Sequence, residues 1–310
     1  MSESVATGSV GPAARSAAGI RLRQSLVAWS FAVPFLVLFL IFMAAPVAVS
    51  LVMSFTDLKS TDITAPFSVD FVGLNNFTRL FGDPTFWKAV LNTAYFVVIG
   101  IPLTIALGLL AAVGVNQGVV RFRALFRVGF YLPVVTSIVA IAVVWRLLLS
   151  GDVGLVNRLL ALVGIQGPDW LHNTTTAMPS LIVMAAWRNM GFLMVIFLAG
   201  LQGIPVMLYE AAEIDGAGRW QRFTQVTLPL LRPTLLFAAV ITSIGYLQFF
   251  EEPFVMTQGG PLNSTLSISF YIYNQFGFGN YSYAASMSYA LFLAIVGLTL
   301  VQFRFLQSNT

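Results

Sequence analysis

A polar segment between two long apolar runs carries the residues best suited to contact another protein. It reads Glu210-Ala211-Ala212-Glu213-Ile214-Asp215-Gly216-Ala217 and continues to Leu228-Pro229. It combines acids, nearby arginines and small residues in a chain that otherwise avoids charge. Small residues allow a partner to approach closely in a helix-in-groove contact. The segment therefore predicts a docking surface. An ordinary interfacial connection would explain its arginines, but explains the whole combination less well.

Side chains that could perform catalysis or bind a metal are few. The chain has no cysteine and a single histidine, His172, so neither a thiolate site nor a histidine cluster is expected. A P-loop needs a lysine directly after glycine to reach the phosphates. The only lysines, Lys59 and Lys88, follow Leu58 and Trp87. We therefore predict no Walker A motif, no cofactor in this chain, no metal site and no catalytic residues.

The composition is that of a polytopic membrane protein. Of 310 residues, 58% are hydrophobic and only 9% are charged, whereas a soluble domain carries about 25% charged residues. The net charge is +4, and its arginines gather in alternate connections, which marks these as cytoplasmic by the positive-inside rule rather than as a nucleic-acid footprint. The arginines concerned are Arg15, Arg21, Arg23, Arg121, Arg123, Arg127, Arg219, Arg222, Arg232 and Arg304.

Six stretches are long and apolar enough to cross a bilayer, which needs roughly 20 residues. The pattern predicts an all-α protein with about six transmembrane helices and both termini in the cytoplasm. Residues 1–24 are expected to form a disordered cytoplasmic tail. The first apolar run is too long for a cleaved signal peptide. The predicted spans are 26–54, 87–115, 124–149, 179–203, 230–256 and 283–306, several of them long enough to need a tilt or a kink.

The polar segment is predicted to fold as two short helices between the fourth and fifth spans. Pro205 can open a helix over Val206–Ile214. Asp215-Gly216 is turn chemistry, because glycine adopts positive φ without strain. A second helix is expected over Arg219–Thr227, after which prolines mark the entry to the fifth span.

Within this segment, Glu210-Ala211-Ala212, Gly216, Val226 and Leu228-Pro229 resemble the EAA loop of ABC importer permeases, with Val226 where isoleucine is usual. Asp215-Gly216-Ala217, Phe223 and the run from Glu251 to Pro261 further resemble the carbohydrate branch, the maltose-type permeases. The resemblance covers roughly residues 25–308, which it implies form one permease domain of the type I importer fold, with cytoplasmic coupling helices at 205–227.

The resemblance also implies partners. They are a second homologous permease subunit, two cytoplasmic ATPase subunits that hold ATP and Mg, and an extracytoplasmic solute-binding protein, with the complex in the plasma membrane of a bacterium or archaeon. No nucleic acid is implied. The residues expected to couple to the ATPase are Glu210, Ala211, Ala212, Asp215, Gly216, Ala217, Arg219, Phe223, Leu228 and Pro229.

A second group of polar residues lies inside the spans. Arg188 sits about ten residues into the fourth span, and an ionisable group there is costly unless it faces a cavity or a partner. Pairing with Glu251 is one interpretation, and a translocation cavity is the other. The positions in this chain that match the family's sugar contacts imply a substrate pathway. The residues at these positions are Arg188, Asn189, Phe192, Thr242, Tyr246 and Phe249. Gln248 and Glu251 are further polar candidates on the fifth span.

These residues suit a sugar, because aromatic faces stack on its rings and polar groups hydrogen-bond its hydroxyls. Aromatic residues stand, however, where the family has amides, and aromatics at helical spacing more often pack than bind. The predicted function is therefore the permease subunit of an ATP-driven importer, for a sugar or oligosaccharide. The alternative is an ion-coupled secondary transporter of small polar solutes. That class needs carboxylates near the bilayer midplane, whereas Glu251 and Glu252 are expected near its exterior edge.

Overall fold

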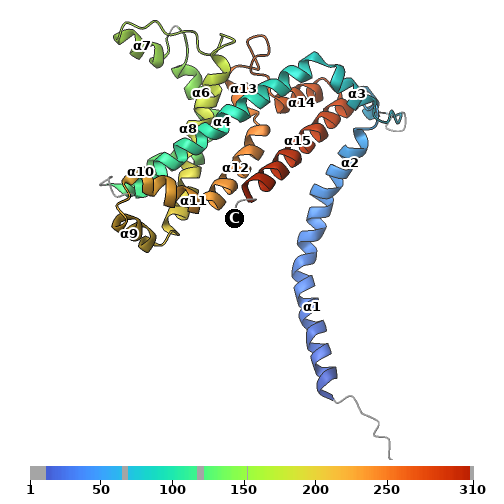
Figure 1. Cartoon of the computed structure of the whole chain (residues 1–310). Helices are drawn as coiled ribbons and strands as arrows, with labels where there is room; N and C mark the ends of the chain where they lie inside the picture. The colour runs from blue at the N-terminus through green and yellow to red at the C-terminus, as the bar shows by residue number, and fades with distance from the viewer. Residues whose placement is uncertain (1–11, 65–68, 117–121, 152, 308–310) are drawn as a thin grey trace, which may run out of the picture. The chain divides into compact units, whose positions relative to one another are not determined.

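The computed structural model describes the backbone of residues 12–64, 69–116, 122–151 and 153–307, and the side chains of these residues except 12–23, 63 and 305–307. This part of the chain is helical (Figure 1). Its only β pairing is an isolated bridge between Thr56 and Phe71. The predicted all-α class is therefore confirmed. The chain divides into two units, Met1–Met53 and Ser54–Thr310.

The first unit is a long apolar helix with one irregular turn. It comprises α1 (Pro12–Phe39), a π-helical turn (Leu40–Ala44) and α2 (Ala45–Met53). The π-helical turn ends two residues before Pro46, whose missing N–H and bulky ring cannot continue regular α-helical hydrogen bonding. The structure describes α1 from Pro12 onward, and the predicted disordered tail, residues 1–24, stays a prediction. Residues 1–11 of that tail, like Arg121 and residue 308, lie outside the described residues.

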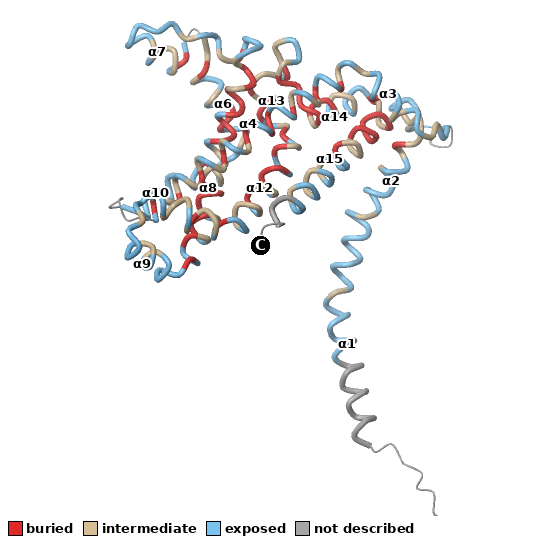
Figure 2. Tube along the Cα trace, in the orientation of Figure 1, coloured by how far each residue is buried: buried red, intermediate tan, exposed pale blue. Residues whose placement is uncertain are grey.

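The second unit is built around α8 (Ala177–Gln202), which packs against α4 (Pro84–Asn116) and α5 (Arg123–Val135). Most of its residues are buried (Figure 2). The approach to α5 is so close that a Cβ at Gly191 would overlap the carbonyl oxygen of Phe130. On the other side of α4 lie α12 (Arg232–Leu247), α14 (Ile268–Gly277) and α15 (Tyr281–Gln307). The remaining helices are α3 (Asn75–Gly82), α6 (Ile138–Leu148), α7 (Leu155–Leu162), α9 (Val206–Ile214), α10 (Arg219–Arg222), α11 (Leu228–Leu230) and α13 (Glu251–Met256), with a 3₁₀ turn at Ser60–Thr64.

Four helices of the described residues are long and apolar enough to cross a membrane, and two bent pairs raise the number to six. Four of the six predicted spans are thus single helices, and the other two correspond to bent pairs. The third is α5 and α6, which meet at 100°. Pro133 has no backbone N–H to donate, and the backbone of Thr136 is extended. The Thr136 hydroxyl donates to the carbonyl oxygen of Leu132 (2.8 Å), so this carbonyl keeps a hydrogen bond where the chain turns.

The fifth predicted span, 230–256, is also interrupted. It enters through α10 and α11 at 66° to α12, and α12 ends at Leu247. Gln248 and Phe250 leave helical geometry before α13 begins at Glu251. Irregular backbone at membrane depth is stable only where it is buried in protein or lines a cavity. The break is therefore a candidate position for a functional site.

A cluster around Asp83 joins α4 to α14 and α15. One carboxylate oxygen of Asp83 accepts from the hydroxyls of Tyr271 (2.6 Å) and Tyr283 (2.7 Å). The other accepts from the backbone N–H groups of Thr85 (2.8 Å) and Phe86 (3.3 Å) at the start of α4. Burial pushes the pKa of Asp83 upward, but these hydrogen bonds outweigh it and hold the pKa below its usual value.

Candidate functional site

The turn after α9 explains the spacing of the polar segment. The N–H of Gly216 donates to the carbonyl of Glu213 (3.1 Å), and the N–H of Ala217 donates to the carbonyl of Ala212 (2.9 Å). These are the two hydrogen bonds of a Schellman motif, which needs a left-handed residue after the helix. Gly216 supplies it with φ +78°. The helix α9 and this turn confirm the predicted Val206–Ile214 helix and Asp215-Gly216 turn.

The second short helix is anchored to the first by side chains. The N–H of Gly218 donates to the side-chain oxygen of Gln221 (2.8 Å), which caps the start of α10. The Arg222 guanidinium lies 3.1 Å from the Glu213 carboxylate. After Arg222 the helix widens into a π-helical segment, Phe223–Thr227, so the predicted helix Arg219–Thr227 is present with a change of type.

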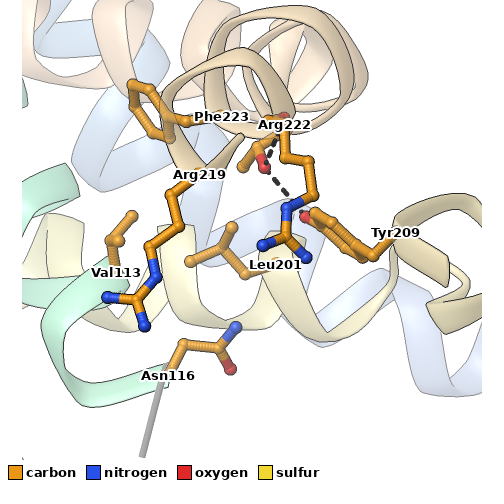
Figure 3. Close-up of a pocket in the computed structure, with 8 residues that line it drawn as sticks. Val113, Asn116, Leu201, Tyr209, Arg219, Arg222 and Phe223 are labelled. Atoms are coloured by element: carbon orange, nitrogen blue, oxygen red, sulfur yellow. Dashed lines mark hydrogen bonds between the residues drawn. The ribbon is translucent and has the colours of Figure 1, made fainter. Parts of the chain in front are cut away.

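A cavity of about 340 Å³ lies beneath this helical pair (Figure 3). The Tyr209 hydroxyl of α9 lies 3.0 Å from the Thr227 hydroxyl, which donates weakly to the Arg222 carbonyl (3.4 Å). Through these contacts α9 and α10 behave as one element. The cavity is lined by Val113, Asn116, Leu201, Tyr209, Arg219, Arg222, Phe223 and Thr227.

The predicted coupling residues fall into two groups. Glu210, Ala211, Asp215 and Gly216 are exposed on α9 and its turn, whereas Ala212 and Ala217 are half-buried. Arg219 and Phe223 line the cavity beneath the pair, and Leu228 and Pro229 are half-buried where the chain enters α12. Large apolar side chains are exposed beside them, including Ile214 at 87% and Trp220 at 74%. Such an apolar patch rimmed by charge is typical of a protein or membrane contact.

A second cavity, of about 290 Å³, lies at the break between α12 and α13. All eight residues predicted for the substrate pathway line it: Arg188, Asn189, Phe192, Thr242, Tyr246, Gln248, Phe249 and Glu251. The structure brings them together from α8, α12 and α13, although Arg188 and Glu251 are 63 positions apart in the sequence (251 − 188). Five further residues complete the lining: Ile138, Leu193, Ile241, Gly245 and Glu252.

The break holds its backbone by local and long-range hydrogen bonds. The N–H of Gln248 donates to Gly245 (3.1 Å), and the Ser267 hydroxyl donates to the Phe249 carbonyl (2.7 Å). Arg146 of α6 donates to the carbonyl of Val255 (3.3 Å) and so fixes α13 from its far end. Satisfied backbone leaves the side chains of the break free to face the cavity.

Arg188 does not form the ion pair with Glu251 that sequence alone allowed. Its Nη1 reaches only the Asn189 side-chain oxygen, at 3.4 Å. Among the described residues, ion pairs are found between Arg222 and Glu213 and between His172 and Asp169. The Nε of Arg188 is buried and has no hydrogen-bond partner in the described part of the chain. An unsatisfied buried donor costs about 1–3 kcal/mol, which argues that something other than this chain completes it.

The aromatic residues of the cavity mostly pack rather than present open faces. Phe249 is 3% exposed, and its ring stacks on Phe96 with centroids 3.9 Å apart. Tyr246 is 5% exposed, meets the same ring edge-on at 5.0 Å, and places its hydroxyl 2.7 Å from that of Thr104. Phe192 remains half-buried. Of the predicted aromatic contacts, Phe192 therefore has the ring most available to a ligand.

The sequence predicted Glu251, but not Glu252, as a residue of the substrate pathway. The structure exposes Glu251 and leaves only 5% of Glu252 accessible, with one carboxylate oxygen that lacks a hydrogen-bond partner among the described residues. Adjacent residues face different ways, and which one turns inward depends on the irregular Phe250, with φ −140°. Two adjacent acids at the end of a predicted span indicated that one of them could line a cavity. Which of the two is buried depends on the break after α12, which the sequence does not reveal.

The remaining ionisable residues offer no metal centre within the described ranges, where no cluster of three or more potential ligands occurs. His172 lies in an exposed connection and contacts Asp169 at 3.0 Å. Burial tends to raise the pKa of Asp169, but hydrogen bonds and charge from His172 hold it below its usual value.

The helical body thus combines a cavity lined by polar and aromatic side chains with an exposed helical pair, an arrangement that suits a transport subunit. The family of binding-protein-dependent transport system inner membrane components matches residues 104–307, and the chain belongs to this family. It is therefore a multi-pass membrane permease subunit of an ABC importer and not an enzyme. The family does not support the ion-coupled alternative.

Relatives cover nearly the whole chain. The lactose transport system permease protein LacF of Rhizobium radiobacter is 39% identical over 281 residues, which are 89% of this chain and 92% of the relative. A bacterial ABC transporter involved in the import of the acidic polysaccharide alginate has a similar structure, with 26% identity, a TM-score of 0.76, and coverage of 94% and 98%. The alginate transporter in complex with an alginate pentasaccharide-bound periplasmic protein gives 27% identity, a TM-score of 0.77, and coverage of 92% and 95%.

Proposed function

We propose that this chain forms, with a second homologous permease, the translocation pathway of an importer for a sugar or oligosaccharide. Family membership supplies the transport role, and relatives whose names specify lactose and alginate support a carbohydrate cargo. The observation that carries the proposal is the cavity at the break between α12 and α13. Its guanidinium, amide and hydroxyl groups can hydrogen-bond a polyhydroxylated ligand, and Phe192 can pack on a sugar ring.

Energy for transport comes from cytoplasmic ATPase subunits that dock on α9 and α10. This surface has exposed charges at Glu210 and Asp215. It also has exposed apolar side chains, Ile214 and Trp220, that a partner protein would bury. The hydrogen bonds and ion pair within the helical pair keep it rigid, so that a pull by the ATPases reaches α8 and α12 directly. ATP and Mg sit on those subunits, because this chain has no P-loop lysine.

The arginine pattern supports a cytoplasmic position for α9, α10 and both termini. The solute-binding protein then delivers cargo from the opposite side, where the connections 54–83, 149–176 and 257–280 lie. The alginate transporter structure with its periplasmic protein supports this partner.

The experiment isolates the coupling surface. Permease pair and ATPase are co-purified through a tag on this chain, reconstituted with the binding protein, and assayed for ATP-dependent uptake of labelled lactose, maltotriose and raffinose. We expect Glu210→Lys to reduce ATPase retention and uptake at least tenfold, while the two permeases still co-purify. Gly216→Pro has the same effect, because proline cannot adopt φ +78°.

Asp70→Lys is the matched control, since it makes the same charge reversal at an exposed residue outside the helical pair. It should leave ATPase retention unchanged. Full uptake by Glu210→Lys, or wild-type uptake without the ATPase under an ion gradient, would contradict the proposal.

A further inference from the structure

Two buried polar atoms in one cavity lack partners in the described part of the chain. They belong to Arg188 on α8 and Glu252 on α13, and both residues line the cavity at the break. A guanidinium only donates hydrogen bonds, and a carboxylate only accepts them. The two are not within ion-pair distance of one another, so neither satisfies the other. A ligand that satisfies both atoms must offer an acceptor to Arg188 and, beside it, a donor to Glu252.

The charges of the cavity narrow the ligand further. Its lining contains two acidic residues, Glu251 and Glu252, and one basic residue, Arg188. The ion pairs of the described residues involve none of the three. An anionic ligand would bring its charge beside two carboxyl groups, and like charges brought together in this way disfavour binding. Arg188 alone does not offset both.

We propose, on the basis of the carbohydrate-importer function above, that Glu252 together with Arg188 selects an uncharged polyhydroxylated cargo and rejects acidic sugars. Neighbouring hydroxyls of a neutral sugar donate to Glu252 and accept from Arg188. Asn189, Thr242 and Gln248 supply further amide and hydroxyl contacts around them. A uronate would place its carboxylate against the same acidic wall.

The fold itself does not set the charge of the cargo. The relatives include a lactose permease and an importer of an acidic polysaccharide, and both match most of this chain. Selection by charge must therefore lie in individual side chains that line the path. Glu252 is the cavity's most buried acid, with 5% exposed, and is therefore the side chain to change first.

The test measures binding to the whole importer, permease pair and ATPases, in nanodiscs. Lactose, maltotriose and raffinose are each compared with the same sugar carrying a C6 carboxylate, by ligand-induced shifts in thermal unfolding. Wild type should bind at least one neutral sugar at least tenfold more tightly than its uronate. Glu252→Gln, which keeps shape and removes charge, should narrow that ratio at least fivefold.

Two further variants sharpen the result. Glu251→Gln, on the exposed side of the same cavity, should narrow the ratio less and gives a second measurement if Glu252→Gln does not fold. Asp169→Asn removes an equal charge from an exposed connection outside the cavity and should leave the ratio unchanged.

Equal binding of a uronate by wild type, a ratio that Glu252→Gln leaves within twofold, or no binding of any neutral sugar would each overturn the proposal. ATPase retention and ATP-dependent uptake are measured separately. They can hold while charge selection fails, so a failure of charge selection is distinguishable from a failure of the importer function.

Discussion

Two polar clusters in the helical body Ser54–Thr310 differ in whether their charged groups have hydrogen-bond partners. At the start of α4, Asp83 receives two tyrosine hydroxyls and two backbone N–H groups. At the break after α12, Arg188 and Glu252 keep buried polar atoms for which the described residues provide no partner. Unmade hydrogen bonds destabilise a buried site, whereas charge-assisted ones stabilise it. The first cluster therefore holds helices together, and the second is where we propose that cargo binds.

The largest expected effect lies at the satisfied cluster. Asp83→Ala removes the acceptor of four hydrogen bonds and leaves two tyrosine hydroxyls without it. Hydrogen bonds to a charged group contribute about 1.5–3 kcal/mol each when buried. Because Asp83 is only half-buried, we expect a total loss of about 2–3 kcal/mol in the free energy of unfolding. The measurement is denaturant unfolding in detergent, with uptake normalised to folded protein.

The exposed Asp70 provides the control for Asp83. Asp70→Ala removes an aspartate in the same connection and should shift the unfolding midpoint by much less. If Asp83→Ala unfolds like wild type but loses transport per folded molecule, the cluster is a functional site and the contrast between the two clusters fails.

The second effect concerns the unsatisfied cluster. Arg188→Gln removes a buried donor that has no partner in the described chain, so stability should stay the same or rise. Loss of one charged contact to cargo should reduce uptake about tenfold, equivalent to about 1.4 kcal/mol. Uptake in proteoliposomes and thermal unfolding of the same sample are compared. Lower thermal stability with unchanged uptake would show that Arg188 is structural.

The regions of the molecule also differ in how far the sequence could predict them. The coupling helices were predicted to within a residue, because their signals are local: Pro205 before α9, and Gly216 at the left-handed turn. The pathway residues converge because α8 and α12 are regular helices, so a helical offset carries position faithfully.

What escaped prediction depends on tertiary packing. The 100° bend after Val135 needs the Thr136 hydroxyl to satisfy a freed carbonyl, which no apolar pattern reveals. The end of α12 at Leu247 rotates α13, so that Glu252 rather than Glu251 is buried. The Asp83 cluster joins residues about 190–200 positions apart, and nothing in their local sequence connects them.

The smallest effect tests how the Asp83 cluster depends on pH. Tyr271→Phe removes one hydroxyl that lowers the Asp83 pKa and should cost about 1 kcal/mol at neutral pH. A carboxylate whose pKa is lower in the folded state stabilises the fold above its unfolded pKa, and this stability is lost as pH falls through the folded value. In the variant the folded pKa of Asp83 moves back toward 3.8, so the variant loses less stability to acid than wild type does, and its loss ends at a higher pH. The difference between the two proteins should therefore be full above about pH 5 and vanish once Asp83 is protonated in both. Unfolding measured between pH 3 and pH 7 checks this, and a difference that stays constant across the range would mean that Tyr271 acts through packing and not through the Asp83 charge.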